Sequence, residues 1–248
     1  MKTRQKKPDY GIDAPSLGRL LLLVVLTMII ADIMLSYTHS EATQTIKSIL
    51  MSLTFTGIVI IFLIIMYVKV EKFRHRDRML NMLLWRGNEQ VLDIGTGRGL
   101  LMIGAARRLK DGKSIGIDIW DKEDLSNNNY NATLLNAKME GVFDKVEIIN
   151  ADAQKLPFSE NSFDYVLSNL CLHNIKTKAG RRSACLEIMR VLKPEGIALI
   201  SDYARTGEYA KEFKEQGFKV EESLSLLIAP LLLHIVKATK NKSAVADL

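Results

Sequence analysis

The chain has 248 residues, two cysteines and a formal net charge of +6. So few cysteines exclude a disulfide-rich scaffold, and neither has the spacing of a metal ligand, so no metal is expected. Much of the positive charge flanks two apolar runs instead of forming one basic patch. This distribution favours a role in membrane topology over nucleic-acid binding, and no nucleic-acid partner is expected.

Two long apolar runs predict a transmembrane helical hairpin over residues 20–70. Ile49–Val68 holds 20 uncharged residues, which is the length that a helix needs to cross a bilayer core of roughly 30 Å. Leu20–Leu35 is a weaker candidate because Asp32 interrupts it, and a cleaved signal peptide is the alternative. No small-x-small cleavage site follows this run, so we expect a retained helix.

Basic residues on both outer flanks of the hairpin predict its orientation. Lysine and arginine are frequent before residue 20 and after residue 68, whereas the linker from about Thr38 to Ser48 has one lysine and one glutamate. The positive-inside rule places both ends of the hairpin in the cytoplasm. We therefore expect an integral membrane protein with a cytoplasmic catalytic domain and the bilayer as a partner.

Segment 71–89, which follows the hairpin, is basic and amphipathic. This pattern predicts a helix that lies on the membrane surface or caps a binding site. The chain is thus expected to comprise a basic N-terminal segment (1–19), the hairpin (20–70), this linker helix (71–89), a catalytic domain (90–240) and a C-terminal tail (241–248).

The run from Val91 to Leu101 carries the strongest functional signal. An apolar strand containing Asp93 breaks into Gly95-Thr96-Gly97-Arg98-Gly99 before an apolar helix begins. Glycines permit positive φ and close approach of the backbone to a ligand, and the helix N-terminus presents free N–H groups. This layout predicts a nucleotide-type cofactor site. The third glycine comes one residue too early for the dinucleotide fingerprint, which argues against an NAD-dependent reductase.

From Gln90 onward, short apolar runs alternate with helical stretches, the pattern of a doubly wound parallel sheet. We expect a Rossmann-like α/β fold of seven mostly parallel strands, the last one antiparallel, preceded by two transmembrane helices. Strands are predicted at 91–94, 114–119, 146–150, 165–168, 197–203, 218–225 and 233–239, and helices at 100–109, 178–192 and 208–216. The apolar run Leu226–Leu233 is either a tight connection or core, or an apolar lip that faces the bilayer.

The motifs follow the order and spacing of the class I S-adenosylmethionine (SAM) methyltransferases. The Asp93–Gly99 run resembles motif I of that family, and Arg190–Gly196 (RVLKPEG) before an apolar strand resembles another signature. Leu156–Phe158 and Ser162–Asp164 resemble the subgroup that includes the ubiquinone and menaquinone biosynthesis methyltransferases. The resemblance covers residues 91–239 and implies SAM as the cofactor.

This resemblance implies a role for each matching residue. The glycines would shape the loop around the methionine part of SAM, and Asp93 would orient that loop and the SAM amino group. Asp118 would accept hydrogen bonds from the ribose hydroxyls, and Asp152 from the adenine amino group. The implied cofactor-binding residues are Asp93, Gly95, Thr96, Gly97, Gly99, Asp118, Ile119, Asp152, Ala153 and Asn169.

Residues after the fourth predicted strand are candidates for the transfer itself. The resemblance places Asn169 near the transferred methyl group. His173 is the candidate general base, because a neutral imidazole can take a proton near pH 7, and the alternative is a histidine that only hydrogen-bonds at the sheet edge. Cys171 is disfavoured as a nucleophile because no base partner is identifiable. No proline follows Asn169, which argues against methylation of exocyclic amines of nucleic-acid bases.

The expected function is transfer of a methyl group from SAM to a hydrophobic small-molecule or lipid-like acceptor, at oxygen or carbon. The alternative is a membrane-anchored SAM sensor or scaffold that no longer catalyses. The acceptor pocket and the oligomeric state leave no signature in the sequence.

Overall fold

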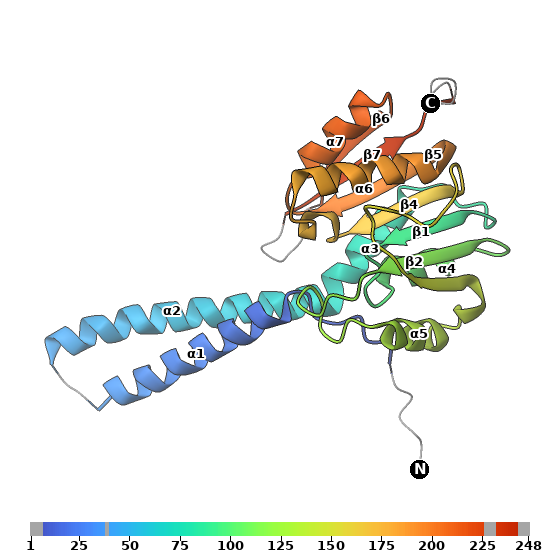
Figure 1. Ribbon diagram of the computed structural model, residues 1–248. Helices are drawn as coiled ribbons and strands as arrows, with labels where there is room; N and C mark the ends of the chain where they lie inside the picture. The colour runs from blue at the N-terminus through green and yellow to red at the C-terminus, as the bar shows by residue number, and fades with distance from the viewer. Residues whose placement is uncertain (1–6, 38–39, 226–231, 243–248) are drawn as a thin grey trace, which may run out of the picture.

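The computed structural model describes residues 7–37, 40–225 and 232–242. Two long antiparallel helices, α1 (Pro15–Leu35) and α2 (Glu41–Met66), project from one end of an α/β domain (Figure 1). The helices of that domain are α3 (Lys72–Asn81), α4 (Leu100–Ala106), α5 (Tyr130–Met139), α6 (Lys178–Val191) and α7 (Thr206–Glu215), with short 3-10 turns at Phe143–Lys145 and Leu172–Asn174.

One seven-stranded sheet forms the centre of the domain, in the order β3-β2-β1-β4-β5-β7-β6. The first five strands in this order are parallel to their neighbours, and β7 is antiparallel to both β5 and β6. The strands are β1 (Gln90–Ile94), β2 (Lys113–Asp118), β3 (Val146–Asn150), β4 (Phe163–Asn169), β5 (Leu192–Asp202), β6 (Lys219–Ser225) and β7 (Leu233–Thr239). The predicted Rossmann-like fold with an antiparallel last strand is confirmed.

Helices cover both faces of the sheet, because every strand of a parallel sheet is buried on both sides. On one face, Met79 and Leu80 of α3 pack with Leu101 of α4 against the central strands. On the other face, Ile188 of α6 and Phe213 of α7 pack in a larger core cluster. The carboxyl ends of the parallel strands therefore meet at one edge, where ligands of this fold class bind.

The two projecting helices are the predicted hairpin. Length and composition make α1 and the helix from Glu41 onward candidates for membrane spans, and only 6% and 11% of their most apolar windows are buried. A core helix of a soluble domain would be mostly buried. The helices touch closely at Val25 and Gly57, where a Cβ on the glycine would lie 2.5 Å from Cγ2 of the valine.

The structure differs from the expected bounds at both ends of α2. The linker is shorter than predicted, because Ser40 caps the helix by accepting a hydrogen bond from the Thr43 N–H and residues 41–48 are helical. At the other end, one π-helical turn (Tyr67–Glu71) joins α2 to α3 without a break. The helix expected over 71–89 ends at Asn81 and packs on the sheet face through fully buried side chains.

The segment before α1 is not a free basic tail. Residues 9–14, which we call the strap, lie along the loop 120–128 that follows β2, and an antiparallel bridge joins Asp13 to Leu125. Ala14 N–H donates to Asp124 O and Ser126 N–H to Ile12 O, both at 3.0 Å. Backbone pairing therefore fastens the entry of the hairpin to the α/β domain.

The structure also differs from the expected bounds at the start of β5. Strand β5 begins at Leu192 instead of Ile197, so most of the Arg190–Gly196 motif, expected to precede this strand, belongs to it, with Glu195 at a φ of 65°. Most of the apolar run Leu226–Leu233 and of the tail 241–248 lies outside the described residues.

Candidate active site

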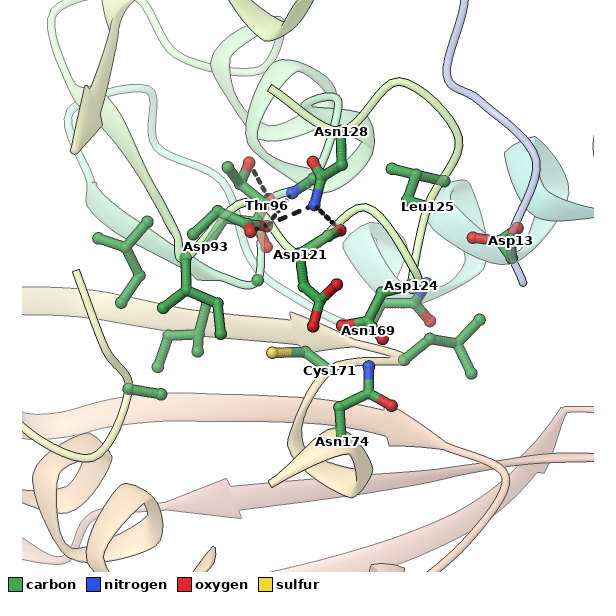
Figure 2. Close-up of a pocket in the computed structure, with 18 of the residues that line it drawn as sticks. Asp13, Asp93, Thr96, Asp121, Asp124, Leu125, Asn128, Asn169, Cys171 and Asn174 are labelled. Carbon is green, nitrogen blue, oxygen red and sulfur yellow. Dashed lines mark hydrogen bonds between the residues drawn. The ribbon is translucent and has the colours of Figure 1, made fainter. Parts of the chain in front are cut away.

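A cavity of about 730 Å³ opens at the carboxyl ends of β1, β2 and β4 (Figure 2). Its walls combine the glycine loop after β1, the loop after β2, residues 151–154 after β3 and residues 169–177 after β4. The strap and the start of the π-helical turn complete the wall. A volume of this size is typical of a site for one small molecule or cofactor.

Asp93, near the end of β1, holds the glycine loop in place through hydrogen bonds. Its Oδ2 accepts hydrogen bonds from Thr96 Oγ1 and from the Met102 N–H, both at 2.9 Å, whereas Oδ1 accepts none from the described residues. Burial raises the pKa of Asp93 to about 7 despite these two bonds. One oxygen thus fixes the loop, and the other is free to meet a ligand.

The glycine loop forms a cradle that only glycine fits. Gly95 and Gly97 have positive φ angles of 69° and 52°. A Cβ on Gly95 would lie 2.2 Å from Sγ of Cys171, and one on Gly97 would lie 2.8 Å from Cδ2 of Leu125. Gly99, with a φ of 87°, then starts α4. The backbone can therefore approach a ligand closely, as predicted for these residues.

Asp118 ends β2, the strand that pairs with β1 and its Asp93. Its carboxylate accepts hydrogen bonds from the Gly97 N–H at 2.7 Å and from the Trp120 N–H at 2.6 Å. The amide of Asn128 is 3.4 Å away and holds the same carboxylate. Asp118 is thus fixed in place beside the glycine loop, in the position where a strand-terminal carboxylate meets a ribose in Rossmann-type sites.

Three more of the implied cofactor-binding residues, including the expected adenine ligand Asp152, also line the cavity. Asp152 is exposed and accepts hydrogen bonds from the side chain and the N–H of Gln154. Ala153 is buried, whereas Ile119 is 64% exposed, so its side chain offers an apolar surface at the open rim. The structure brings these three residues to the same wall.

Asn169 and Cys171 close the inner end of the cavity. Asn169 Oδ1 is buried near the His75 side chain, whereas Asn128 Oδ1 on the opposite wall is buried without a hydrogen-bond partner among the described residues. An unpaired buried oxygen of this kind indicates a missing ligand or water. Burial raises the pKa of the Cys171 thiol well above its usual range, so this cysteine is uncharged and a poor nucleophile.

His173 does not line the cavity. Its ring Nδ1 lies 2.8 Å from Oδ1 of Asp202, a fully buried residue at the end of β5, and its ring packs on Tyr203 with 4.5 Å between centroids. The backbone N–H of His173 donates to the same carboxylate at 3.1 Å. This arrangement favours the alternative of a histidine that is hydrogen-bonded at the sheet edge.

No motif predicted the contribution of the strap and of the junction between α2 and α3 to the cavity wall. Tyr10, Asp13, Tyr67 and Lys72 all line the cavity. The Lys72 ammonium is buried and donates to the carbonyls of Tyr10 and Gly11 at 3.0 and 2.7 Å. A lysine among basic neighbours carries no signal of such a role. The apolar and acidic stretch Tyr10–Asp13 within a basic terminus was the signal available.

The site fits SAM on its own geometry. The glycine cradle admits a close ligand, and the unpaired amide oxygen of Asn128 needs a partner. Carboxylates at the ends of β1, β2 and β3 match the ammonium, hydroxyl and amino donors of SAM. The roles of the individual residues remain predictions.

Comparisons with known proteins identify the same domain. Residues 92–200 match a family model described as a methyltransferase domain. The chain is 30% identical over 145 residues to the ubiquinone/menaquinone biosynthesis C-methyltransferase UbiE of Rickettsia prowazekii, covering 57% of this chain and 56% of that protein. It is 32% identical over 128 residues to the sterol 4-C-methyltransferase strm-1 of Caenorhabditis elegans, covering 52% of this chain and 35% of that protein.

Solved structures share the fold at low sequence identity. The YcgJ protein of Bacillus subtilis aligns with a TM-score of 0.56 and 17% identity, over 68% of this chain and 98% of that one. A SAM-dependent methyltransferase from Aquifex aeolicus aligns with a TM-score of 0.52 and 18% identity, over 66% and 88%. The [4+2]-cyclase SpnF also aligns, at a TM-score of 0.56 and 18% identity, over 68% and 80%.

The chain spans 56% of the Rickettsia protein and 35% of the nematode protein, and the matched part is the α/β domain. A shared fold does not fix the reaction, as the cyclase illustrates. The match of residues 92–200 and the curated relatives nevertheless show that the α/β domain of this chain is a methyltransferase domain, and they support SAM as its cofactor.

Proposed function

We propose that this protein is a membrane-anchored methyltransferase that methylates a hydrophobic small-molecule or lipid-like acceptor at the cytoplasmic membrane surface. The observation that carries the proposal is that both ends of the apolar hairpin enter the wall of the cavity. Asp13 lies two residues before α1, and Tyr67 immediately follows α2. An anchor that served only for attachment would not need to contribute to the site.

The cofactor half of the proposal rests on the glycine loop and three carboxylates. SAM, when bound, supplies a methyl group activated by its sulfonium sulfur. The free Oδ1 of Asp93 would hold the cofactor ammonium, Asp118 the ribose and Asp152 the adenine. The chain's own contribution is positioning and exclusion of water. Leu125, which is 9% exposed, provides an apolar cover over Gly97.

The membrane half of the proposal rests on exposure and charge. Apolar side chains of α1 and α2 are widely exposed, with exposed fractions of 59% to 68% at Leu23, Met34, Phe55 and Phe62. Exposed apolar side chains around both helices need a nonaqueous environment. The basic residues near Tyr67 and in α3 suit the anionic cytoplasmic leaflet. These features support a cytoplasmic α/β domain seated at the bilayer surface.

The acceptor class follows from which residues line the cavity. Tyr67, which directly follows α2, is one of them, so a membrane-borne acceptor would be held close to the cavity, and curated relatives are named for ubiquinone, menaquinone and sterol methylation. Truncating the hairpin is a poor test, because removing residues 1–70 would take Tyr10, Asp13 and Tyr67 out of the cavity wall. The full-length protein is therefore required.

The experiment measures SAM binding to the full-length protein in detergent by calorimetry, beside Asp118→Ala and Asp152→Ala. We expect clear binding by the wild type and loss or sharp weakening in both variants. The wild type is then incubated with labelled SAM and a total lipid extract of its own cell membranes. Label in an extracted lipid supports the proposal. SAM binding without any lipid labelling would instead favour the sensor or scaffold.

A further inference from the structure

The acceptor end of the cavity holds more carboxylates than the cofactor needs. The carboxylates that line the cavity are Asp13, Asp93, Asp118, Asp121, Glu123, Asp124 and Asp152. Asp93 and Asp118 are held by backbone N–H groups, and Asp152 by Gln154. The remaining four lie on the strap and on the loop after β2, and they need a separate explanation.

Asp13 is already engaged by its surroundings. The Tyr67 hydroxyl lies near its carboxylate, and the buried Lys72 ammonium lies 3.7 Å from its Oδ2. Asp121 is likewise used within its own loop, where Oδ1 accepts the Glu123 N–H at 2.9 Å. One oxygen of each carboxylate is thus engaged in a contact that orders the wall.

Asp124 differs from these carboxylates in its neighbours. Figure 2 shows it on the side of the cavity where Asn169 and Asn174 lie, away from Asp93. Its side chain is hydrogen-bonded by the Asn174 amide, and no backbone N–H holds it among the described residues. Asp124 is exposed, so a proton that it accepts can pass on to water.

The backbone at Asp124 is fixed by the segment that leads into the membrane. Its carbonyl accepts the Ala14 N–H at 3.0 Å, and the next residue, Leu125, forms the bridge to Asp13. The loop after β2 is thus held over the cavity by the strap. A base on this loop would be in place only when the hairpin entry is docked.

We infer that Asp124 is the general base of the reaction and that the acceptor carries an acidic proton on its reacting atom, as a hydroxyl or an activated carbon does. The inference rests on the proposed function. The reacting atom bonds to the methyl carbon and gives its proton to the Asp124 carboxylate. The electrons of the broken carbon–sulfur bond stay on sulfur, and Asp124 releases the proton to solvent.

The charges around Asp124 suit this role. Partial burial, followed by the Asp121 carboxylate, raises the pKa of Asp124, and Asp118 acts in the same direction, whereas His173 opposes them. The other charged groups of the surrounding cavity wall are Asp13, Lys72, Asp93, Arg98, Glu123, Asp152 and Lys176. A carboxylate with a raised pKa is a stronger base for a hydroxyl or an activated carbon than an ordinary one.

The test compares Asp124→Asn with Asp121→Asn, which removes the same charge from the same loop. Each full-length variant is assayed for SAM binding by calorimetry and for labelling of its own membrane lipid extract over a range of pH. We expect Asp124→Asn to bind SAM within about threefold of the wild type and to label lipid at least about 100-fold more slowly, the usual scale for a lost general base. At saturating SAM, the rate of the wild type should fall toward acid pH, and Asp124→Asn should not show this fall.

Each outcome decides the inference. Near-normal labelling by Asp124→Asn, or an equal loss in Asp121→Asn, would overturn the assignment while leaving the proposed function intact. Loss of SAM binding in Asp124→Asn would also overturn it, because Asp124 would then serve the cofactor. Absence of labelling by a wild type that binds SAM would refute the proposed function itself, and the inference with it.

Discussion

His173 and Asp202 form a close pair behind the segment that follows β4, with 2.8 Å between Nδ1 and Oδ1. Asp202 is fully buried, and it also accepts the backbone N–H groups of His173 and Tyr203. One carboxylate thus joins the end of β5 to the 3-10 turn after β4. The pair fixes the wall that carries Asn169 and Asn174, so its effect on the cavity is indirect.

Replacing His173 should therefore affect stability more than chemistry. His173→Gln leaves the buried Asp202 carboxylate with poorer pairing, which we expect to cost about 1–3 kcal/mol of unfolding free energy. Lipid labelling, measured where the variant is folded, should fall less than about tenfold. Denaturant unfolding and the labelling assay check the two parts. A loss near 100-fold in a stably folded variant would restore His173 as the candidate base.

SAM affinity should depend on the protonation of Asp93. Burial raises its pKa to about 7, so its carboxyl is mostly protonated below pH 7 and charged above it. Because the ligand ammonium prefers the charged form, the dissociation constant should rise toward tenfold for each unit of pH below 7. Calorimetry between about pH 5.5 and 8.5 measures this dependence.

The matched variant for that titration is Asp93→Asn, which keeps the shape of the side chain and has no proton to lose. It should bind SAM more weakly at pH 8, with a profile that no longer changes around pH 7. An unchanged profile in this variant would assign the titration to another group. The adjacent Thr96 hydroxyl, which donates to Asp93, does not titrate in this range.

The fold could be predicted because its signals are local. Alternation of apolar runs with helical stretches and the glycine loop after Asp93 each extend over a few residues, and the bounds of six predicted strands lie within two residues of the observed ones. The bounds failed where tertiary packing overrides local pattern. The stretch 71–89 appeared suited to a membrane surface, yet Met79 and Leu80 are fully buried on the sheet.

The acceptor side of the site could not be predicted, because its contacts join distant parts of the chain. Asp13 meets Leu125, and Lys72 reaches the Tyr10 carbonyl 62 residues away. No periodicity marks a six-residue strap, and a lysine in a basic helix gives no hint of its partner. His173 was chosen for its imidazole chemistry, but its pairing with Asp202 depends on the register of β4 and β5.

Lys72 should hold the strap and the loop after β2 together. Lys72→Met leaves the carbonyls of Tyr10 and Gly11 without their buried donor, at a cost of about 1–3 kcal/mol for each unpaired group. Amide hydrogens of residues 9–14 and 124–126 should then exchange at least about tenfold faster, and both segments should change together. Hydrogen exchange followed by mass spectrometry measures this on the full-length protein.

Lys69→Met is the control for that experiment, because Lys69 is exposed on the preceding turn and its loss removes the same charge. Exchange in residues 9–14 and 124–126 should stay at the wild-type rate in this variant. If Lys72→Met freed residues 9–14 alone, the strap and the loop after β2 would not be coupled as the backbone pairing indicates.

The hairpin should depend on the close approach of Val25 and Gly57. A Cβ on Gly57 would lie 2.5 Å from Cγ2 of Val25, whereas one on Gly18 of α1 would meet nothing within 4 Å. Gly57→Ala should therefore overpack the helix interface, at a cost of about 1–3 kcal/mol, and Gly18→Ala should not. Helix loss in mixtures of dodecyl maltoside and dodecyl sulfate, followed by circular dichroism, compares the variants.

The double variant Val25→Ala with Gly57→Ala separates a steric effect from a general one. Removing the Val25 methyl groups leaves its Cβ 3.8 Å from the new Cβ at position 57, an ordinary contact. The double variant should therefore unfold at a higher fraction of dodecyl sulfate than Gly57→Ala alone. This is expected even though alanine is smaller than the native valine at position 25 and larger than the native glycine at position 57. Additive destabilisation of the two substitutions would show that α1 and α2 do not pack at this point, because coupled effects are expected only for residues in contact.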